Sequence, residues 1–109
     1  FFIILLAIDI LAERKDGKGF LVIELKRDRA SDKVIGQILR YMGYVEKHLC
    51  TDNQTVSGCI IAQEKDQNLE YALRRVNDVE FLRYESTLGL PMKASTRIVI
   101  NTKPIFTER

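Results

Sequence analysis

Hydrophobic residues repeat with two different periods along this chain, and the two periods alternate. Four short apolar runs suit β-strands, over about residues 3–12, 20–26, 56–62 and 79–84. Between them, apolar residues recur every three or four positions, which is the spacing of one face of a helix. The longer helical segment ends near residue 49, and its stripe consists of Val34, Ile38, Tyr41, Met42, Val45 and Leu49.

The order of these segments is β-β-α-β-α-β, which predicts an α/β fold with a mixed β-sheet flanked by helices. An Asp-Gly pair lies between the first two apolar runs, and this pair favours a tight hairpin turn. The first two strands should therefore pair directly. Residues 97–100, an arginine followed by three β-branched apolar residues, predict an additional strand near the end of the chain.

Polar residues mark where both helices begin. Ser31 or Asp32 can cap the first helix and Asp66 the second, because a side-chain oxygen there accepts a bond from a free backbone amide. The first helix also contains Gly36 and Gly43. Each glycine lowers helix propensity by about 1 kcal/mol, so we expect both to allow close packing on the sheet.

Length and composition are those of one ordinary globular domain, with 109 residues, 46% of them hydrophobic and 29% charged. The net charge of +2 neither requires nor excludes nucleic acid as a partner. Cys50, Cys59 and the single His48 cannot build a zinc site or a disulfide framework. We expect two free thiols, which fit a reducing, cytoplasmic location.

The first eight residues are apolar, but so short a run cannot span a bilayer. No basic stretch precedes it and no small-residue cleavage site follows, as a signal peptide would require. We therefore expect no membrane association. The chain does not begin with Met, and we expect further residues upstream of Phe1.

Three ionisable residues stand out on the first two strands. Asp9 interrupts the first apolar run, and Glu24 and Lys26 share one face at the end of the second. If the hairpin pairs these strands, Asp9 lies beside Glu24, and two adjacent buried carboxylates stay ionised only with a compensating cation. Mg²⁺ prefers oxygen ligands and suits phosphate chemistry, because it polarises a phosphoryl oxygen and lowers the pKa of bound water.

Lys26 could then orient the attacking water or stabilise charge that develops on the phosphate. A structural interpretation remains open for the same residues. Asp9 could make only local hydrogen bonds, and Glu24 could form an exposed ion pair with Lys26 worth about 0–1 kcal/mol.

Gln37 and Tyr41 lie four positions apart on one face of the first predicted helix. That helix follows the Glu24–Lys26 strand after a short loop, so its first half should pack near the end of that strand. The two residues could also be a mostly buried helix pair without a chemical role.

Together these residues resemble the motif of the PD-(D/E)XK nuclease superfamily. The resemblance is closest to the nuclease domain of the NucS endonucleases and more distant to RecB-type domains. Such families carry an Asp on one strand, Glu-x-Lys on the next and Gln-x-x-x-Tyr on the following helix. The similarity extends over about residues 8–84. Five residues match the pattern in order and spacing, namely Asp9, Glu24, Lys26, Gln37 and Tyr41.

The resemblance implies a restriction-endonuclease-like core over residues 1–85, without the helix that relatives carry upstream, and a C-terminal extension over 86–109. Asp9, Glu24 and the carbonyl of Leu25 would bind Mg²⁺, with Mn²⁺ able to substitute. Lys26 would position the water, and Gln37 and Tyr41 would shape the catalytic site or touch the DNA backbone. Relatives have Gly-Arg where this chain has Leu6-Ala7.

The implied activity is metal-dependent endonuclease hydrolysis of DNA phosphodiester bonds, in DNA repair or defence. DNA would be the partner, with single-stranded and branched forms among the candidates, and a homodimer is compatible with the family. Four basic residues near the site would contact nucleic acid and make binding salt-dependent, namely Arg27, Arg29, Lys33 and Arg40. Without the resemblance they would be read as solvated positions.

Two alternative functions remain open from the sequence. The chain could be a catalytically silent nucleic-acid-binding module of the same fold. It could also be a protein-interaction domain whose apolar first strand pairs with another chain.

Overall fold

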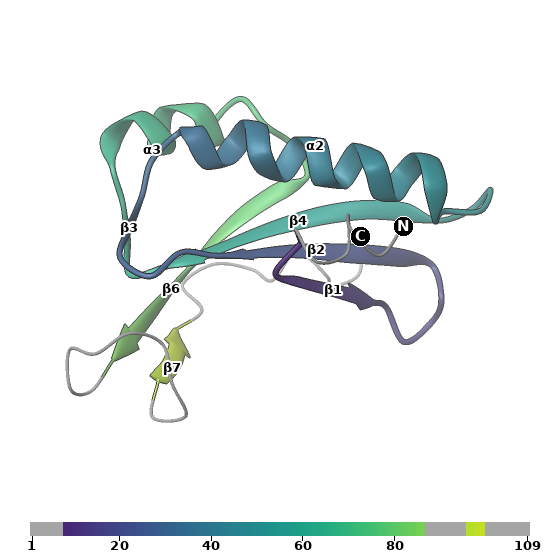
Figure 1. The fold of residues 1–109 in the computed structure, drawn as a ribbon, viewed down its shortest axis with the longest axis horizontal. Helices are drawn as coiled ribbons and strands as arrows, with labels where there is room; N and C mark the ends of the chain where they lie inside the picture. The colour runs from purple at the N-terminus through teal and green to yellow at the C-terminus, as the bar shows by residue number, and fades with distance from the viewer. Residues whose placement is uncertain (1–7, 87–95, 100–109) are drawn as a thin grey trace.

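A mixed sheet forms the centre of the computed structural model, which describes residues 8–86 and 96–99. In this part of the chain the sheet has five strands in the order β1-β2-β4-β6-β7. The strand bounds are β1 Ile10–Glu13, β2 Gly19–Leu25, β4 Thr55–Ala62, β6 Val79–Ser86 and β7 Thr96–Val99. The helices α2 (Lys33–His48) and α3 (Gln67–Leu73) lie on the same face of the sheet (Figure 1). The predicted fold class and element order are confirmed.

Strand pairing follows from the connections between the strands. β1 and β2 form an antiparallel hairpin, and Gly17 in its turn has a φ of 73°, which glycine adopts without strain. β2–β4 and β4–β6 are parallel, because a helix crosses between the strands of each pair. β7 pairs antiparallel with β6, close to the strand predicted over 97–100. The division of the chain at residue 85 stays a prediction.

Two very short strands were not predicted. β3 (Arg29–Ala30) follows β2, β5 (Glu64–Lys65) follows β4, and the two pair in parallel as a separate two-stranded sheet. The segments that follow β2 and β4 therefore continue side by side past the end of the main sheet. Of the strand predicted over 3–12, the described residues include β1, and residues 3–7 lie outside them.

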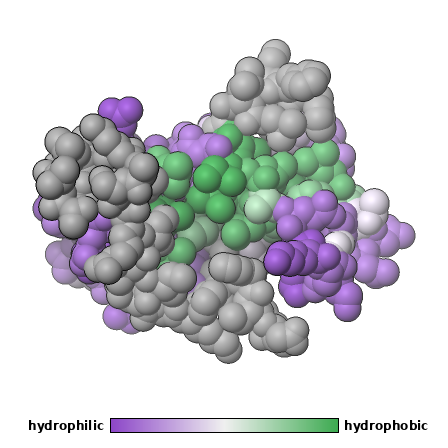
Figure 2. Space-filling view, turned by 90° about the horizontal axis from the view of Figure 1, so that it is seen from below, coloured by the Kyte–Doolittle hydropathy of each residue, from purple (hydrophilic) through white to green (hydrophobic). Residues whose placement is uncertain are grey.

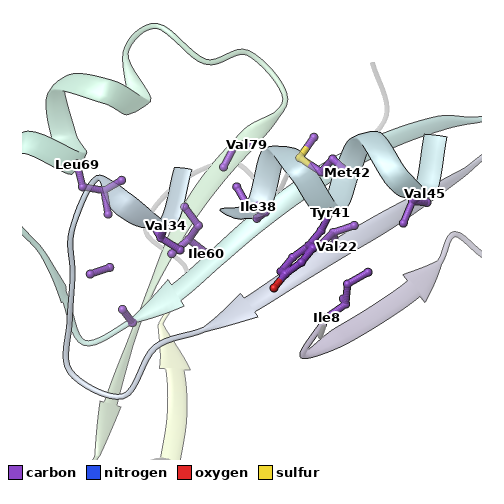
Figure 3. Packing of buried hydrophobic residues seen from close by; sticks show 12 residues of the cluster. Ile8, Val22, Val34, Ile38, Tyr41, Met42, Val45, Ile60, Leu69 and Val79 are labelled. Atoms are coloured by element: carbon purple, nitrogen blue, oxygen red, sulfur yellow. The ribbon is translucent and has the colours of Figure 1, made fainter. Parts of the chain in front are cut away.

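The main core lies between the sheet and α2. Its centre, shown in Figure 3, includes fully buried side chains from β2, β4 and α2, namely Val22, Ile60, Ile38 and Val45. β4 is buried from residue 58 to 62, as expected of a central strand. Its Gly58 lets α2 approach, since a Cβ there would lie 2.7 Å from the Met42 sulfur. Gly36 and Gly43 face open space, so the prediction that they allow close packing is wrong.

The opposite face of the sheet carries a second, smaller cluster. Cys59, Ile61 and Tyr84 are buried there, with leucine and isoleucine side chains of β2 and β6 packed around them. Figure 2 views the molecule from this side and shows hydrophobic residues across its middle. β2 therefore contributes alternate residues to two apolar layers.

The helix ends agree in part with the capping predictions. The Asp66 carboxylate accepts a 2.8 Å bond from the Leu69 N–H and caps α3 as predicted. Asp32 occupies the N-cap position of α2 but makes no capping bond with its side chain. Ser31 Oγ instead accepts a long 3.4 Å bond from the Lys33 N–H. Within the described ranges, neither helix is long and apolar enough to cross a membrane.

Ile38→Ala should lower the free energy of unfolding by about 2–5 kcal/mol, because it empties a fully buried site between α2 and β4. Leu39→Ala is the matched control on the same helix, since Leu39 is 42% exposed, and it should change stability by less than about 1 kcal/mol. Urea denaturation followed by circular dichroism measures both. Equal losses would contradict this description of the core.

Candidate active site

Glu24 is the one charged residue among the buried side chains of the described chain, at 3% exposure. It lies near the end of β2 on the face covered by α2, two positions after the core residue Val22. The Glu24 carboxylate lies 3.4 Å from the ammonium of Lys26, which is half-buried. Its other oxygen, Oε1, is buried and accepts no hydrogen bond in the described structure. An unpaired buried acceptor of this kind costs about 1–3 kcal/mol.

Asp9 lies beside Glu24, as the hairpin predicts. The register pairs Ile10 with Ile23, and one step further places Asp9 opposite Glu24. Asp9 is exposed and directly precedes β1, so the prediction that it sits buried within the strand is wrong. The reason is a contact between strands, because the Asp9 carboxylate accepts a 2.7 Å bond from the Leu25 N–H in place of a backbone partner.

The charge state of Glu24 reflects these surroundings. Burial raises the pKa of the Glu24 carboxyl above its ordinary value, and the negative charge of Asp9 raises it further. The Lys26 ammonium acts in the opposite direction and lowers this pKa without overcoming the other two effects. The positive charge of Lys26 therefore does not fully offset the cost of keeping Glu24 ionised.

A hydrogen-bonded chain links the strand to α2. Lys26 Nζ donates to Gln37 Oε1 at 3.2 Å, and Gln37 Nε2 donates to the Tyr41 hydroxyl at 3.2 Å. Tyr41 is 7% exposed, and Figure 3 shows its ring between α2 and β2. Gln37 and Tyr41 thus lie on the helix face turned toward the strand end, and they fix where the ammonium of Lys26 sits.

The same strand end opens to solvent. A cavity of about 310 Å³ is lined by Asp9, Leu25, Lys26 and Arg27. The Leu25 N–H points toward Asp9. Because a residue in a strand directs its N–H and its C=O to the same side, the Leu25 carbonyl faces Asp9 as well. The Asp9 carboxylate and the Leu25 carbonyl therefore lie at one edge of the hairpin, and Asp9 is close enough to Glu24 for its charge to act on that carboxyl.

This donor set suits a hard divalent cation. Mg²⁺ in proteins is commonly held by one or two carboxylates, with water and substrate phosphate completing its shell. The unpartnered Glu24 Oε1 is an oxygen that such an ion would satisfy. Across the described residues no group of three or more His, Cys, Asp or Glu side chains could hold a metal ion, so any ion here would need the backbone carbonyl, water or phosphate as further ligands.

Backbone and side-chain bonds fix the segment that follows β2, and no local sequence pattern predicts them. The Lys26 N–H donates to the Ile61 carbonyl at 2.8 Å, and the Asp28 carbonyl accepts from the Gln63 N–H at 2.9 Å. Between them, the Tyr84 hydroxyl donates to the Arg27 carbonyl. These contacts join residues more than thirty positions apart, so only the strand order reveals them.

The four predicted nucleic-acid contacts are all exposed but differ in position. Arg27 lines the cavity. Arg29 lies 3.4 Å from Glu64 in an exposed ion pair, and Lys33 is the first residue of α2. Arg40 stacks over the Tyr41 ring, 5.5 Å from its centroid. Of these four basic residues, Arg27 is the one that lines the cavity.

The two cysteines are free thiols, as predicted, and lie away from this chemistry. Cys59 is buried on the opposite face of the sheet. Burial, and secondarily the charge of Glu80, raises the pKa of the Cys59 thiol to about 12. It stays protonated at neutral pH and is a poor nucleophile.

Comparison with known proteins agrees with the predicted resemblance. Residues 1–101 match the family model of the endonuclease NucS C-terminal domain. A repair endonuclease from Pyrococcus abyssi is 25% identical, with a TM-score of 0.58 over 70% of this chain and 31% of that one. EndoMS in its apo form is 25% identical, with a TM-score of 0.55 over 67% of this chain and 30% of that one.

EndoMS in complex with dsDNA, at 24% identity and a TM-score of 0.55, shares the fold over 68% of this chain and 29% of that one. The chain thus spans about a third of the length of these solved relatives. No curated protein matches it.

Glu24→Gln should raise the free energy of unfolding at pH 7. The raised pKa of Glu24 means that the folded state disfavours the ionised carboxylate, so its cost appears as pH rises through that pKa. Below about pH 4 the carboxyl is protonated in both folded and unfolded states, and the difference between variant and wild type should vanish.

Thermal melting between pH 4 and pH 8 in EDTA measures this effect. Glu46→Gln, at an exposed position of α2, is the control and should change stability little at either pH. A Glu24→Gln variant less stable than wild type at pH 7 would mean that Lys26 fully compensates the carboxylate.

Proposed function

The chain belongs to the family of the endonuclease NucS C-terminal domain, and from that premise we propose that it is a metal-dependent endonuclease domain that hydrolyses DNA phosphodiester bonds. The solved relatives at 25% identity include a repair endonuclease, and DNA repair is the proposed setting. The observation that carries the proposal is Glu24, which is buried with one oxygen unpartnered beside Asp9 and Lys26, and these two neighbours line an open cavity.

The proposed cation ligands are Asp9, Glu24 and the Leu25 carbonyl. The ion is Mg²⁺, and Mn²⁺ should substitute because it accepts the same oxygen donors. When bound, such an ion polarises a phosphoryl oxygen and lowers the pKa of a coordinated water. The protein's contribution is to bring two carboxylates together despite their repulsion and to leave the cavity side open for phosphate.

Lys26 is proposed to hold the attacking water and to stabilise negative charge on the phosphate. Its ammonium carries three donors, and the structure uses one toward Gln37 and directs one toward Glu24. A third remains for water or a phosphoryl oxygen. As the water oxygen forms its bond to phosphorus it releases a proton to solvent, the bond to the departing alcohol oxygen breaks, and that oxygen takes up a proton from solvent.

Gln37 and Tyr41 are proposed to shape the site rather than to touch the DNA. The support is burial, because Tyr41 is 7% exposed and its hydroxyl already accepts from Gln37. Gln37 in turn accepts from Lys26, so the pair holds the ammonium in one orientation.

Lys26→Ala and Glu24→Ala should each lower cleavage of labelled DNA by at least about 100-fold, the loss seen when one oriented donor is removed from an active site. Lys47→Ala is the matched control, because Lys47 is exposed in the last turn of α2, and it should cut like wild type. Single-stranded, branched and duplex substrates should be compared with Mg²⁺, with Mn²⁺ and with EDTA.

Cleavage that needs the metal and is lost in both variants supports the proposal. Cleavage that persists in EDTA, or that either variant retains, contradicts the assigned roles. A folded wild-type chain that binds DNA without cutting it would instead be a silent binding module, and one that neither binds nor cuts would point to protein interaction.

Contact with DNA is proposed for the exposed basic residues Arg27, Arg29, Lys33 and Arg40. Arg27→Ala should weaken DNA binding and reduce the slope of log Kd against log salt by about 1, because one phosphate contact is lost. Arg14→Ala is the control at the far end of β2, where Arg14 pairs with Asp16, and it should leave the slope unchanged. Fluorescence anisotropy in EDTA at several salt concentrations measures both, and equal slopes for both variants would exclude a phosphate contact by Arg27.

A further inference from the structure

Tyr84 is the largest fully buried side chain of the described residues that carries a polar group, at 1% exposure. It lies on β6, in the apolar cluster on the sheet face opposite α2 and α3. Its hydroxyl donates a hydrogen bond to the backbone carbonyl of Arg27, 57 residues earlier in the chain. A buried hydroxyl is costly without such a partner, so the contact explains a tyrosine where phenylalanine would fill the same space.

The accepting carbonyl belongs to the residue directly after Lys26. On the other side of Lys26, its own N–H donates to the Ile61 carbonyl of β4 at 2.8 Å. The backbone is therefore held on both sides of the Lys26 Cα, by β4 before it and by β6 after it. With the main chain fixed, the position of the ammonium depends on side-chain torsions alone, which Glu24 and Gln37 restrict.

We propose that Tyr84 is a positioning residue for Lys26, acting from the opposite face of the sheet through the Arg27 carbonyl. The inference rests on the proposed function, because it assigns Lys26 a role in hydrolysis. The same contact fixes the carbonyl of Arg27, which lines the cavity together with Lys26.

The hydroxyl is suited to act as a permanent donor. Burial raises the pKa of the Tyr84 phenol, and the nearby Asp28 carboxylate raises it further, while Arg27 opposes them weakly. Tyr84 therefore stays protonated at any pH at which the domain would work, so its hydrogen bond to Arg27 is not lost by deprotonation.

Tyr84→Phe tests the inference, because it removes the hydroxyl and keeps the ring in the core. The variant should lower kcat for DNA cleavage about 10-fold and leave KM within about twofold, as expected when one hydrogen bond that orients a catalytic group is lost. Tyr71→Phe is the matched control, since the exposed Tyr71 hydroxyl bonds only Gln67 among the described residues, and it should keep wild-type kcat.

Amide hydrogen exchange supplies a readout that does not need activity. In Tyr84→Phe the Lys26 amide should exchange about 10-fold faster, while the amide of Ile60 in the core of β4 keeps its wild-type rate. Faster exchange at both positions would mean a general loss of stability and would overturn the positioning role. Unchanged exchange at Lys26, or an unchanged kcat in an active protein, would overturn it as well.

The two proposals fail in different ways. If wild-type protein cuts no DNA with Mg²⁺ or Mn²⁺, the proposed function fails and the exchange data alone decide whether Tyr84 holds Lys26. If wild type cuts and Tyr84→Phe cuts equally well, the nuclease proposal stands and the Tyr84 inference is wrong.

Discussion

A carboxylate buried under α2, at the end of β2, is the constraint on which the rest of the site depends. Glu24 is almost fully covered, its Oε1 has no hydrogen-bond donor in the described structure, and Asp9 lies beside it. A protein keeps such a group only where something offsets the cost of desolvation and repulsion. Lys26 supplies part of that compensation, and the proposed divalent cation would supply the remainder.

The position of β2 in the sheet makes this arrangement rigid. β2 pairs with β1 on one side and with β4 on the other, and its residues alternate between the two apolar layers. The strand thereby presents Glu24 and Lys26 to α2 while Leu25 anchors the opposite layer. The segment beyond it is bonded to β4 and to β6, so both faces of the sheet contribute to the geometry of one edge.

Local pattern predicted most of the fold and most of the candidate site. The periodicity of α2, the Asp66 cap and the hairpin turn depend on neighbouring residues, and all three are present. Strand and helix periods placed Glu24, Lys26, Gln37 and Tyr41 on facing surfaces, and the family resemblance grouped them as one site. Sequence reasoning failed where tertiary contacts decide the outcome.

Three particulars illustrate that limit. Gly58, and not the glycines of α2, is where an added Cβ would meet side chains across the helix–sheet interface, which depends on how α2 lies over β4. Asp9 lies outside β1 because its carboxylate accepts the hydrogen bond from the Leu25 amide. Tyr84 contacts Arg27 only because β6 neighbours β4 in the sheet, and no local pattern carries that information.

The most direct test of the account is the pKa of Glu24 itself, measured by carbon-detected NMR titration of its side-chain carboxyl with and without Mg²⁺. The account predicts a value above that of an ordinary glutamate in EDTA, and a clear decrease when Mg²⁺ is added, because the cation stabilises the ionised form. A Glu24 pKa that saturating Mg²⁺ leaves unchanged would contradict the proposal that this carboxylate is a metal ligand.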